Sequence, residues 1–193
     1  MIIGLTGPTG AGKSCLRVIA EDLGFKVIDC DIIARKATEK GADSLKALVK
    51  VFGDDILESD GSLNRKALAK KAFATKENTE LLNKTIFPFI TELVKKEITC
   101  DKVILDAPTL FESGINSMCD TVIAVTAEKE IRLDRIIKRD NIDKESALLR
   151  INAGKTDDFY LKNADYLIYN NGENNVFALE FKEILTKILC EEN

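Results

Sequence analysis

Eight residues near the start of the chain have the spacing of a phosphate-binding loop. Residues 7–14 are Gly-Pro-Thr-Gly-Ala-Gly-Lys-Ser, and they fit the pattern G-x-x-x-x-G-K-S/T at every fixed position. Glycines let a backbone wrap closely around phosphate groups, whose negative charge is favoured by backbone N–H groups and by a helix N-terminus. In such loops the lysine, here Lys13, reaches the β- and γ-phosphates, and the Ser14 hydroxyl binds Mg²⁺. The pattern predicts nucleotide binding and leaves the reaction open.

The candidate nucleotide and metal contacts extend beyond the loop. The nucleotide contacts are predicted at Gly7, Thr9, Gly10, Ala11, Gly12, Lys13, Ser14 and Cys15. A second metal ligand beside Ser14 is predicted at Asp106, which ends the apolar run Val103-Ile104-Leu105. A carboxylate at the end of a buried strand is typical of the Mg²⁺ shell in nucleotide-binding proteins. The alternative is that Asp106 only caps a turn before Pro108.

Asp31 is the candidate general base. It follows Lys26-Val27-Ile28, which we predict to be the second strand, and the carboxyl end of a strand beside the first one faces ligands in α/β sheets. Because the chain contains no histidine, the base must be a carboxylate, a lysine, a tyrosine or a cysteine. A carboxylate here could accept the proton of an acceptor hydroxyl, or it could cap a helix that begins at Ile32. Spacing alone favours neither interpretation.

These side chains need a sheet whose strands end at one edge, and the hydrophobic pattern predicts such a sheet. Near-continuous apolar runs separated by helical stretches are typical of a parallel sheet that is covered on both faces. The runs occupy residues 1–5, 26–28, 103–105, 121–125 and 166–169. We therefore predict an α/β fold of the P-loop kinase type, with a five-stranded parallel sheet flanked by helices.

Two helical stretches interrupt this core. Residues 32–100 have helical patterns and no strand of their own, so we predict a helical insertion between the second and third strands. Within it Gly53 ends one helix, Asn64 caps the next, and Pro88 separates two more. Residues 128–163 are helical and dense in charge. The remaining segments, 1–31, 101–127 and 164–193, form the nucleotide-binding core of a single domain.

Composition excludes several classes of function. The formal net charge of −4 over 193 residues argues against a nucleic-acid partner, because binding to the phosphate backbone needs a basic surface. The lack of histidine excludes Ser-His-Asp and Cys-His nucleophile systems. Five scattered cysteines without a C-x-x-C pair favour reduced thiols over disulfides or zinc. Since no long apolar stretch occurs, we predict a cytoplasmic protein without membrane contact, and the sequence does not predict its oligomeric state.

Motifs along nearly the whole chain resemble those of the dephospho-coenzyme A kinase family. The stretch from Asp29 to Arg35 is similar to its D-x-D-x-I-A-R segment, and residues 105–112 to its L-D-x-P-L-L-F-E segment. Arg135 to Asp140 match the R-x-x-x-R-D of the family's lid. The other matches are Phe52-Gly53 with residues 60–65, Leu82-Asn83 with Pro88, and residues 164–172.

The resemblance implies an activity and a set of roles. The activity is transfer of the γ-phosphoryl group of ATP, with Mg²⁺, to the ribose 3′-hydroxyl of dephospho-coenzyme A, the final step of coenzyme A biosynthesis. Asp31 is then the base, and Arg135 and Arg139 are lid cations that act with Lys13 on the transferring group. Residues 32–100 help to bind the acceptor, and residues 128–163 form the lid. The resemblance places three residues near the adenine: Asn170, Asn171 and Gly172.

Some positions depart from the family pattern. Phe87 stands where the family commonly has histidine, and Gly154 where a lid glutamine is usual. Asp157 and Asp158 make the lid more acidic, which bears on acceptor affinity and lid closure. The lid arginines could also belong to a solvated helix of mixed charge, and we assign Arg132 and Lys138 to that simpler class.

Other functions remain in view. A nucleoside monophosphate kinase or another small-metabolite kinase would share the loop and the fold, and would differ in its acceptor pocket. A coenzyme A-binding protein without catalytic activity would keep the fold as well. A GTPase is excluded, because Asn83-Lys84-Thr85-Ile86 lacks the aspartate that reads guanine in N-K-x-D.

Overall fold

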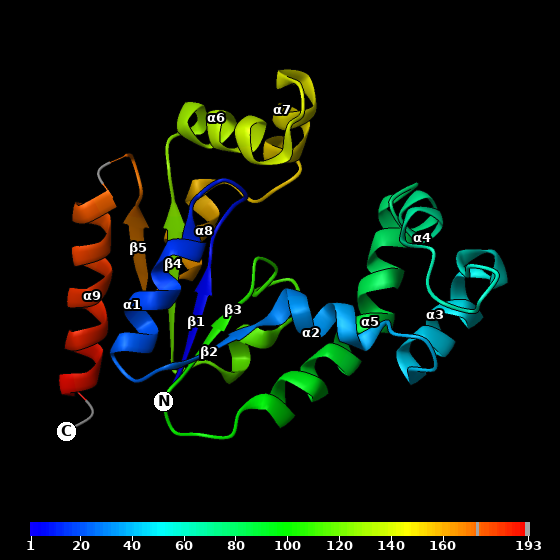
Figure 1. The fold of residues 1–193 in the computed structure, drawn as a ribbon, viewed down its shortest axis with the longest axis horizontal. Helices are drawn as coiled ribbons and strands as arrows, with labels where there is room; N and C mark the ends of the chain where they lie inside the picture. The colour runs from blue at the N-terminus through cyan, green and yellow to red at the C-terminus, as the bar shows by residue number, and fades with distance from the viewer. Residues whose placement is uncertain (173, 192–193) are drawn as a thin grey trace. The chain divides into compact units, whose positions relative to one another are not determined.

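The protein is described by a computed structural model that covers residues 1–172 and 174–191 (Figure 1). Its five strands form one sheet in the order β2-β3-β1-β4-β5, in which β1 pairs in parallel with β3 and β4, and β4 with β5. The strands are β1 (Ile2–Thr6), β2 (Lys26–Asp29), β3 (Val103–Asp106), β4 (Thr121–Thr126) and β5 (Tyr166–Tyr169). The predicted fold class is therefore confirmed.

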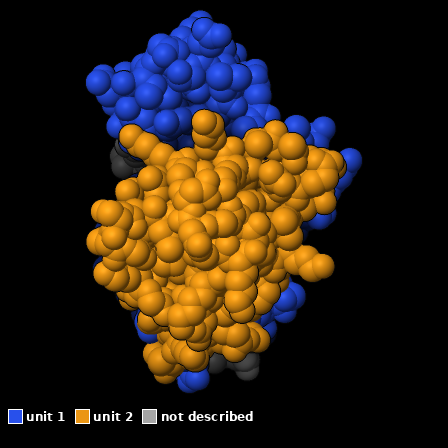
Figure 2. Space-filling model, turned by 90° about the vertical axis from the view of Figure 1, so that its right-hand side faces the viewer, with its two compact units in different colours: residues 1–28, 100–110, 116–193 blue, residues 29–99, 111–115 orange. Residues whose placement is uncertain are grey.

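The chain divides into two compact units, whose residues are coloured separately in Figure 2. The first unit contains residues 1–28, 100–110 and 116–193, and the second contains residues 29–99 and 111–115. The first unit has helices α1 (Leu16–Asp22), α6 (Lys129–Asp140), α7 (Lys144–Asn152), α8 (Asp157–Asn163) and α9 (Asn174–Glu191). The second has helices α2 (Cys30–Ala37), α3 (Asp43–Phe52), α4 (Arg65–Ala72) and α5 (Lys76–Glu97).

Alternation along β1 places its side chains on two packed faces. Ile3 and Leu5 join a cluster with residues of α1 and α9, two helices that lie beside each other in Figure 1. The helices contribute Leu16, Ala20, Phe177, Phe181, Leu185 and Ile188 to this cluster. On the other face, a Cβ on Gly4 would lie 2.7 Å from a methyl carbon of Leu110, so the Leu110 side chain packs closely against the strand there. Burial on both faces explains the continuous apolar pattern of the strand.

Two of the three helix boundaries predicted within residues 32–100 are confirmed, and the third is wrong. The side chain of Asn64 accepts a hydrogen bond from Ala67 N and starts α4, as predicted, and Gly53 ends α3 with a φ of 89°. Pro88 was predicted to separate two helices, and this is wrong because it lies inside the single helix α5. The buried face of α5 runs through Ile86, Ile90 and Val94 without a break. Burial of that stripe outweighs the backbone hydrogen bond that proline removes.

The charged stretch after β4 forms three short helices. Leu133 and Ile136 of α6 pack with Ala147 and Ile151 of α7 in a small hydrophobic cluster of their own. Within the described residues, no helix has the length and apolar character needed to cross a membrane.

Candidate active site

The phosphate-binding loop follows β1, and its backbone requires glycine at the ends of the motif. Gly7 has a φ of 142°, and a Cβ there would lie 1.9 Å from the carbonyl oxygen of Val125. Gly12 has a φ of 89°, and its Cβ would lie 2.4 Å from Nδ2 of Asn170. Both positions combine left-handed backbone with a close neighbour, so any side chain would be strained. The loop geometry thus explains both fixed glycines of the motif.

The last residues of the loop lie in a short 3₁₀ turn, η1 (Lys13–Cys15), which precedes α1. The Lys13 ammonium donates a hydrogen bond to the Gly7 carbonyl oxygen at 3.0 Å, which keeps the charge beside the loop. The Ser14 side chain is exposed, and the Cys15 thiol donates to the Gly12 carbonyl oxygen at 2.9 Å. Partial burial raises the pKa of the Cys15 thiol, and its backbone hydrogen bond and Arg135 act against this shift.

Two of the predicted residues hold the outer side of this loop. Arg135 of α6 donates hydrogen bonds to the carbonyl oxygens of Gly10, at 3.3 Å, and Ala11, at 3.4 Å. Its other terminal nitrogen donates to Oδ1 of Asn170 at 3.1 Å, and Asn170 Nδ2 donates to the Ala11 carbonyl oxygen at 2.9 Å. Asn170 is buried at the end of β5. The structure therefore brings the loop, Arg135 and Asn170 together.

Arg132 was assigned to the solvated surface of its helix, and this is wrong. Only 5% of the residue is exposed, and its Nε donates to the Thr9 carbonyl oxygen at 3.1 Å. A terminal guanidinium nitrogen lies 3.6 Å from Oδ1 of Asp157, which accepts a hydrogen bond from the buried Thr126 hydroxyl at 2.7 Å. Burial lowers the pKa of Arg132, against the attraction of Asp157 and Tyr160.

The spacing of the lid arginines could have identified Arg132 as a loop contact, although the mixed charge of the helix suggested a solvated surface. Arg132, Arg135 and Arg139 are three and four residues apart, so they follow one side of α6. That side reaches the loop at Arg132 and Arg135. Lys138 of the same helix is exposed, as predicted.

Arg139 lies further along α6 and is exposed. It donates hydrogen bonds to both carboxylate oxygens of Asp140, which also pairs with Arg150. The hydrogen bond to Asp140 raises the pKa of Arg139, and the same bond lowers the pKa of Asp140. Its role above a phosphoryl group stays a prediction.

The predicted metal ligands are a hydroxyl of the loop after β1 and a carboxylate at the end of the neighbouring strand β3. Asp106 is the last residue of β3, in register with Leu5 of β1, and its Oδ1 atom is buried. Ser14 is the last residue of the loop that leaves β1. A hydroxyl and a carboxylate suit Mg²⁺, which binds one or two carboxylates together with substrate phosphates instead of an all-protein cage. The donor set therefore fits Mg²⁺.

The remaining predicted adenine contacts lie in the turn after β5. Asn171 accepts a hydrogen bond from Glu128 N at 2.9 Å, and its amide nitrogen donates to the Glu128 carboxylate at 3.2 Å. Gly172 has a φ of 122°, and apart from its chain neighbours no heavy atom of the described residues lies within 4 Å of where its Cβ would be. The amide of Asn171 thus links this turn to the start of α6.

The cap of the helix that follows β2 is Asp29, the last residue of that strand, and not Asp31. Helix α2 begins at Cys30 and not at Ile32, and its N-cap is Asp29. One Asp29 carboxylate oxygen accepts hydrogen bonds from Asp31 N, at 2.9 Å, and Ile32 N, at 3.0 Å. The capping interpretation of Asp31 is therefore wrong. Asp31 lies in the first turn of α2 with its side chain exposed.

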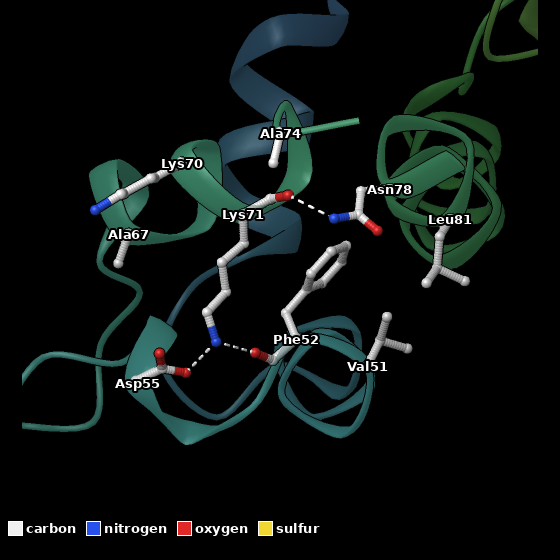
Figure 3. A pocket seen from close by; sticks show the side chains of 9 residues that line it. All are labelled: Val51, Phe52, Asp55, Ala67, Lys70, Lys71, Ala74, Asn78 and Leu81. Atoms are coloured by element: carbon white, nitrogen blue, oxygen red, sulfur yellow. Dashed lines mark hydrogen bonds and ion pairs between the residues drawn. The ribbon is translucent and has the colours of Figure 1, made fainter. Parts of the chain in front are cut away.

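Two of the protein's cavities lie within the second unit. One, of 540 Å³, lies between α3, α4 and α5 (Figure 3). There the Lys71 ammonium bonds to Asp55 and to the Phe52 carbonyl oxygen, so its charge is already paired. The other, of 430 Å³, is lined by α5 residues that include Asn83, Lys84 and Phe87, and by Ser113.

The sheet order and the glycine-rich loop after β1 define a nucleotide-binding protein with the P-loop kinase fold. The family model described as CoaE, dephospho-CoA kinase, matches residues 1–175. A dephospho-CoA kinase of Fusobacterium nucleatum is 41% identical over 174 residues, which cover 89% of this chain and 90% of that protein. The chain belongs to the dephospho-CoA kinase family.

Solved structures agree with this assignment. A crystal structure of a Thermus thermophilus protein has a TM-score of 0.80 at 28% identity, covering 100% of this chain and 98% of that one. A dephospho-CoA kinase from Campylobacter jejuni has a TM-score of 0.71 at 27% identity, with the same coverage. The family predicted from the sequence motifs is confirmed.

Proposed function

We propose that this protein transfers the γ-phosphoryl group of ATP to the ribose 3′-hydroxyl of dephospho-coenzyme A. The chain is a member of a kinase family, and residues 1–175 match that family's model. The observation that supports ATP as the phosphoryl donor is the loop at residues 7–14. Its carbonyl oxygens accept hydrogen bonds from the side chains of Arg132, Arg135 and Asn170, which lie outside the loop. The acceptor follows from the family.

The donor half of the reaction depends on positioning and charge. The loop N–H groups and Lys13 bind the phosphates, and Arg135 and Arg139 supply positive charge near the transferring group. Ser14 and Asp106 would hold Mg²⁺, which when bound neutralises charge on the β- and γ-phosphate oxygens. Asn170, Asn171 and Gly172 form the adenine side of the site.

The acceptor half depends on Asp31. The 3′-hydroxyl oxygen forms a bond to the γ-phosphorus while the bond from that phosphorus to the β,γ-bridging oxygen breaks, leaving ADP. Asp31 orients the hydroxyl and accepts its proton. Residues 32–100 bind the rest of the acceptor, and residues 128–163 act as the lid.

A comparison of acceptors tests the proposed activity. Purified protein with Mg²⁺ and ATP should phosphorylate dephospho-coenzyme A far faster than AMP or GMP, with ADP formation and coenzyme A formation measured in parallel. Equal or greater rates with a nucleoside monophosphate would identify another small-metabolite kinase. Binding of dephospho-coenzyme A without ADP formation would identify a non-catalytic binding protein.

The cavity beside α5 is the proposed acceptor subsite, because Asn83 and Pro88, which belong to a motif that the family shares, line it. Phe87 is half-buried there, next to Pro88. Phe87→Ala should raise the KM for dephospho-coenzyme A by about fivefold, since part of an aromatic side chain's burial is lost. The KM for ATP should not change. Phe73→Ala, at an exposed position at the C-terminal end of α4, is the matched control and should change neither KM. If Phe87→Ala raised only the KM for ATP, the assignment of this cavity would be wrong.

A further inference from the structure

Three successive peptide groups of the phosphate-binding loop are held by their carbonyl oxygens. Arg132 binds the oxygen of Thr9, Arg135 binds those of Gly10 and Ala11, and Asn170 binds that of Ala11 again. All the donors are side chains outside the loop. The loop conformation is thus determined from its outer side by helix α6 and by the residue after β5.

Fixing a carbonyl also fixes the N–H group that follows it. A trans peptide is planar, and its C=O and N–H bonds point in opposite directions. A hydrogen bond from Arg132 to the Thr9 carbonyl oxygen therefore directs the Gly10 N–H away from Arg132. Backbone N–H groups are the parts of such loops that bind phosphate oxygens.

The contact between α6 and the loop is close as well as polar. A Cβ on Gly10 would lie 2.8 Å from the carbonyl oxygen of Arg132 and 3.1 Å from its Cα. Gly10 has a φ of 82°, which favours glycine on its own account. The backbone of the loop at this point lies directly on the backbone of α6.

A buried guanidinium needs a counterion, and Asp157 provides it. The Arg132 side chain is only 6% exposed, whereas the Asp157 side chain is 44% exposed. An unpaired buried charge is strongly unfavourable, while a half-exposed carboxylate is still solvated. The Thr126 hydroxyl, at the buried end of β4, holds the same Asp157 oxygen. Loss of Asp157 therefore leaves a buried charge unpaired, whereas loss of Arg132 leaves a carboxylate that water still solvates.

We propose that Arg132 is a positioning residue, which directs the Gly10 N–H toward the nucleotide phosphates, and that Asp157 is the counterion that stabilises it. The inference rests on the nucleotide donor of the proposed function and not on its acceptor. Asp157 is one of the acidic positions that depart from the family pattern. It forms an internal pair with the lid's own arginine.

Binding of inorganic tripolyphosphate and of adenosine, measured by calorimetry well below the melting temperature, separates positioning from folding. Arg132→Met keeps the volume and removes the hydrogen bond to Thr9, so the Kd for tripolyphosphate should rise about tenfold, the lower end for a bond to a charged group. The Kd for adenosine should not change. Lys138→Met, at an exposed position of the same helix, should leave both values unchanged.

Asp157→Asn and the double variant complete the test. Asp157→Asn leaves the buried guanidinium unpaired and should lower the melting temperature, while tripolyphosphate affinity stays within about threefold because the Thr9 contact remains. Adding Arg132→Met should restore the melting temperature and not the affinity. Tripolyphosphate affinity within twofold of wild type in both Arg132→Met and the double variant overturns the proposal. The proposal is also overturned if the tripolyphosphate affinities of the three variants rise and fall together with their melting temperatures. Should Arg132→Met alone fail to fold, the double variant decides.

This test does not depend on which acceptor is used. Should dephospho-coenzyme A prove not to be the substrate, tripolyphosphate binding would still report on the loop. Should Arg132→Met have no effect while dephospho-coenzyme A is phosphorylated, only the positioning role fails.

Discussion

Lys13→Ala should lower the turnover number by about 10²–10³-fold, the usual effect of removing one charge-stabilising donor from a transition state. The lysine ammonium follows the negative charge that builds up on the β- and γ-phosphates during transfer. We expect the melting temperature to stay close to that of wild type, because Lys13 is not part of the buried core and its hydrogen bond to the Gly7 carbonyl oxygen lies within the loop. Steady-state rates with dephospho-coenzyme A and thermal unfolding measure the two quantities.

Lys138→Ala is the control for this substitution, since Lys138 is an exposed lysine on α6. It should change neither the rate nor the melting temperature. A fall in kcat/KM for ATP that is caused by KM alone would indicate that Lys13 contributes equally to ground-state and transition-state binding. Rates of Lys13→Ala near wild type would show that the loop does not carry the transferred phosphate.

The loop and the sheet could be predicted because several independent signals agree there. The glycine pattern, the apolar run before it and the helical spacing after it all point to one arrangement. The positions of Gly7 and Gly12 in left-handed backbone, against Val125 and Asn170, give the physical reason for the pattern. Family membership was also readable, because its motifs occur in order along the chain.

The predictions for Pro88 and Arg132 are wrong because tertiary contacts override local sequence preferences at both positions. Pro88 stays inside α5 because the buried face of that helix continues on both sides of it. Arg132 is buried because the loop, which is 123 residues away in sequence, supplies a carbonyl oxygen and α8 supplies a carboxylate. A mixed-charge helix looks solvated until its long-range partners are known.

The start of α2 differs by two residues from the start that would make Asp31 its cap. Asp29 and Asp31 both suit a cap by residue type, and the sequence could not decide where α2 begins. The structure assigns the cap to Asp29, whose carboxylate accepts two backbone N–H groups. Asp31 therefore has no capping role that would compete with a catalytic one.

Asp31→Asn should lower the turnover number by about 10²–10⁴-fold, the range for a positioned acid or base. The substitution keeps the shape of the side chain and removes its negative charge and its capacity to accept the acceptor's proton. Stability should change little, because an acidic residue in the first helical turn contributes only about 0.3–1 kcal/mol through the helix dipole. ATP affinity should stay at the wild-type value, since the loop binds the donor. Single-turnover rates and thermal unfolding measure these effects.

Asp29→Ala is the matched control, and the structure predicts the opposite pattern for it. Loss of the cap of α2 should lower the free energy of unfolding by about 0.5–2 kcal/mol. Its turnover number at a temperature where the protein is folded should fall only modestly. If Asp31→Asn retained a rate within a few-fold of wild type while Asp29→Asn lost most of its activity, the base would be Asp29, and its capping bonds would have to be exchanged for the acceptor hydroxyl. If neither substitution slowed phosphoryl transfer, no carboxylate after β2 would take the acceptor's proton, and catalysis would rest on positioning and charge alone.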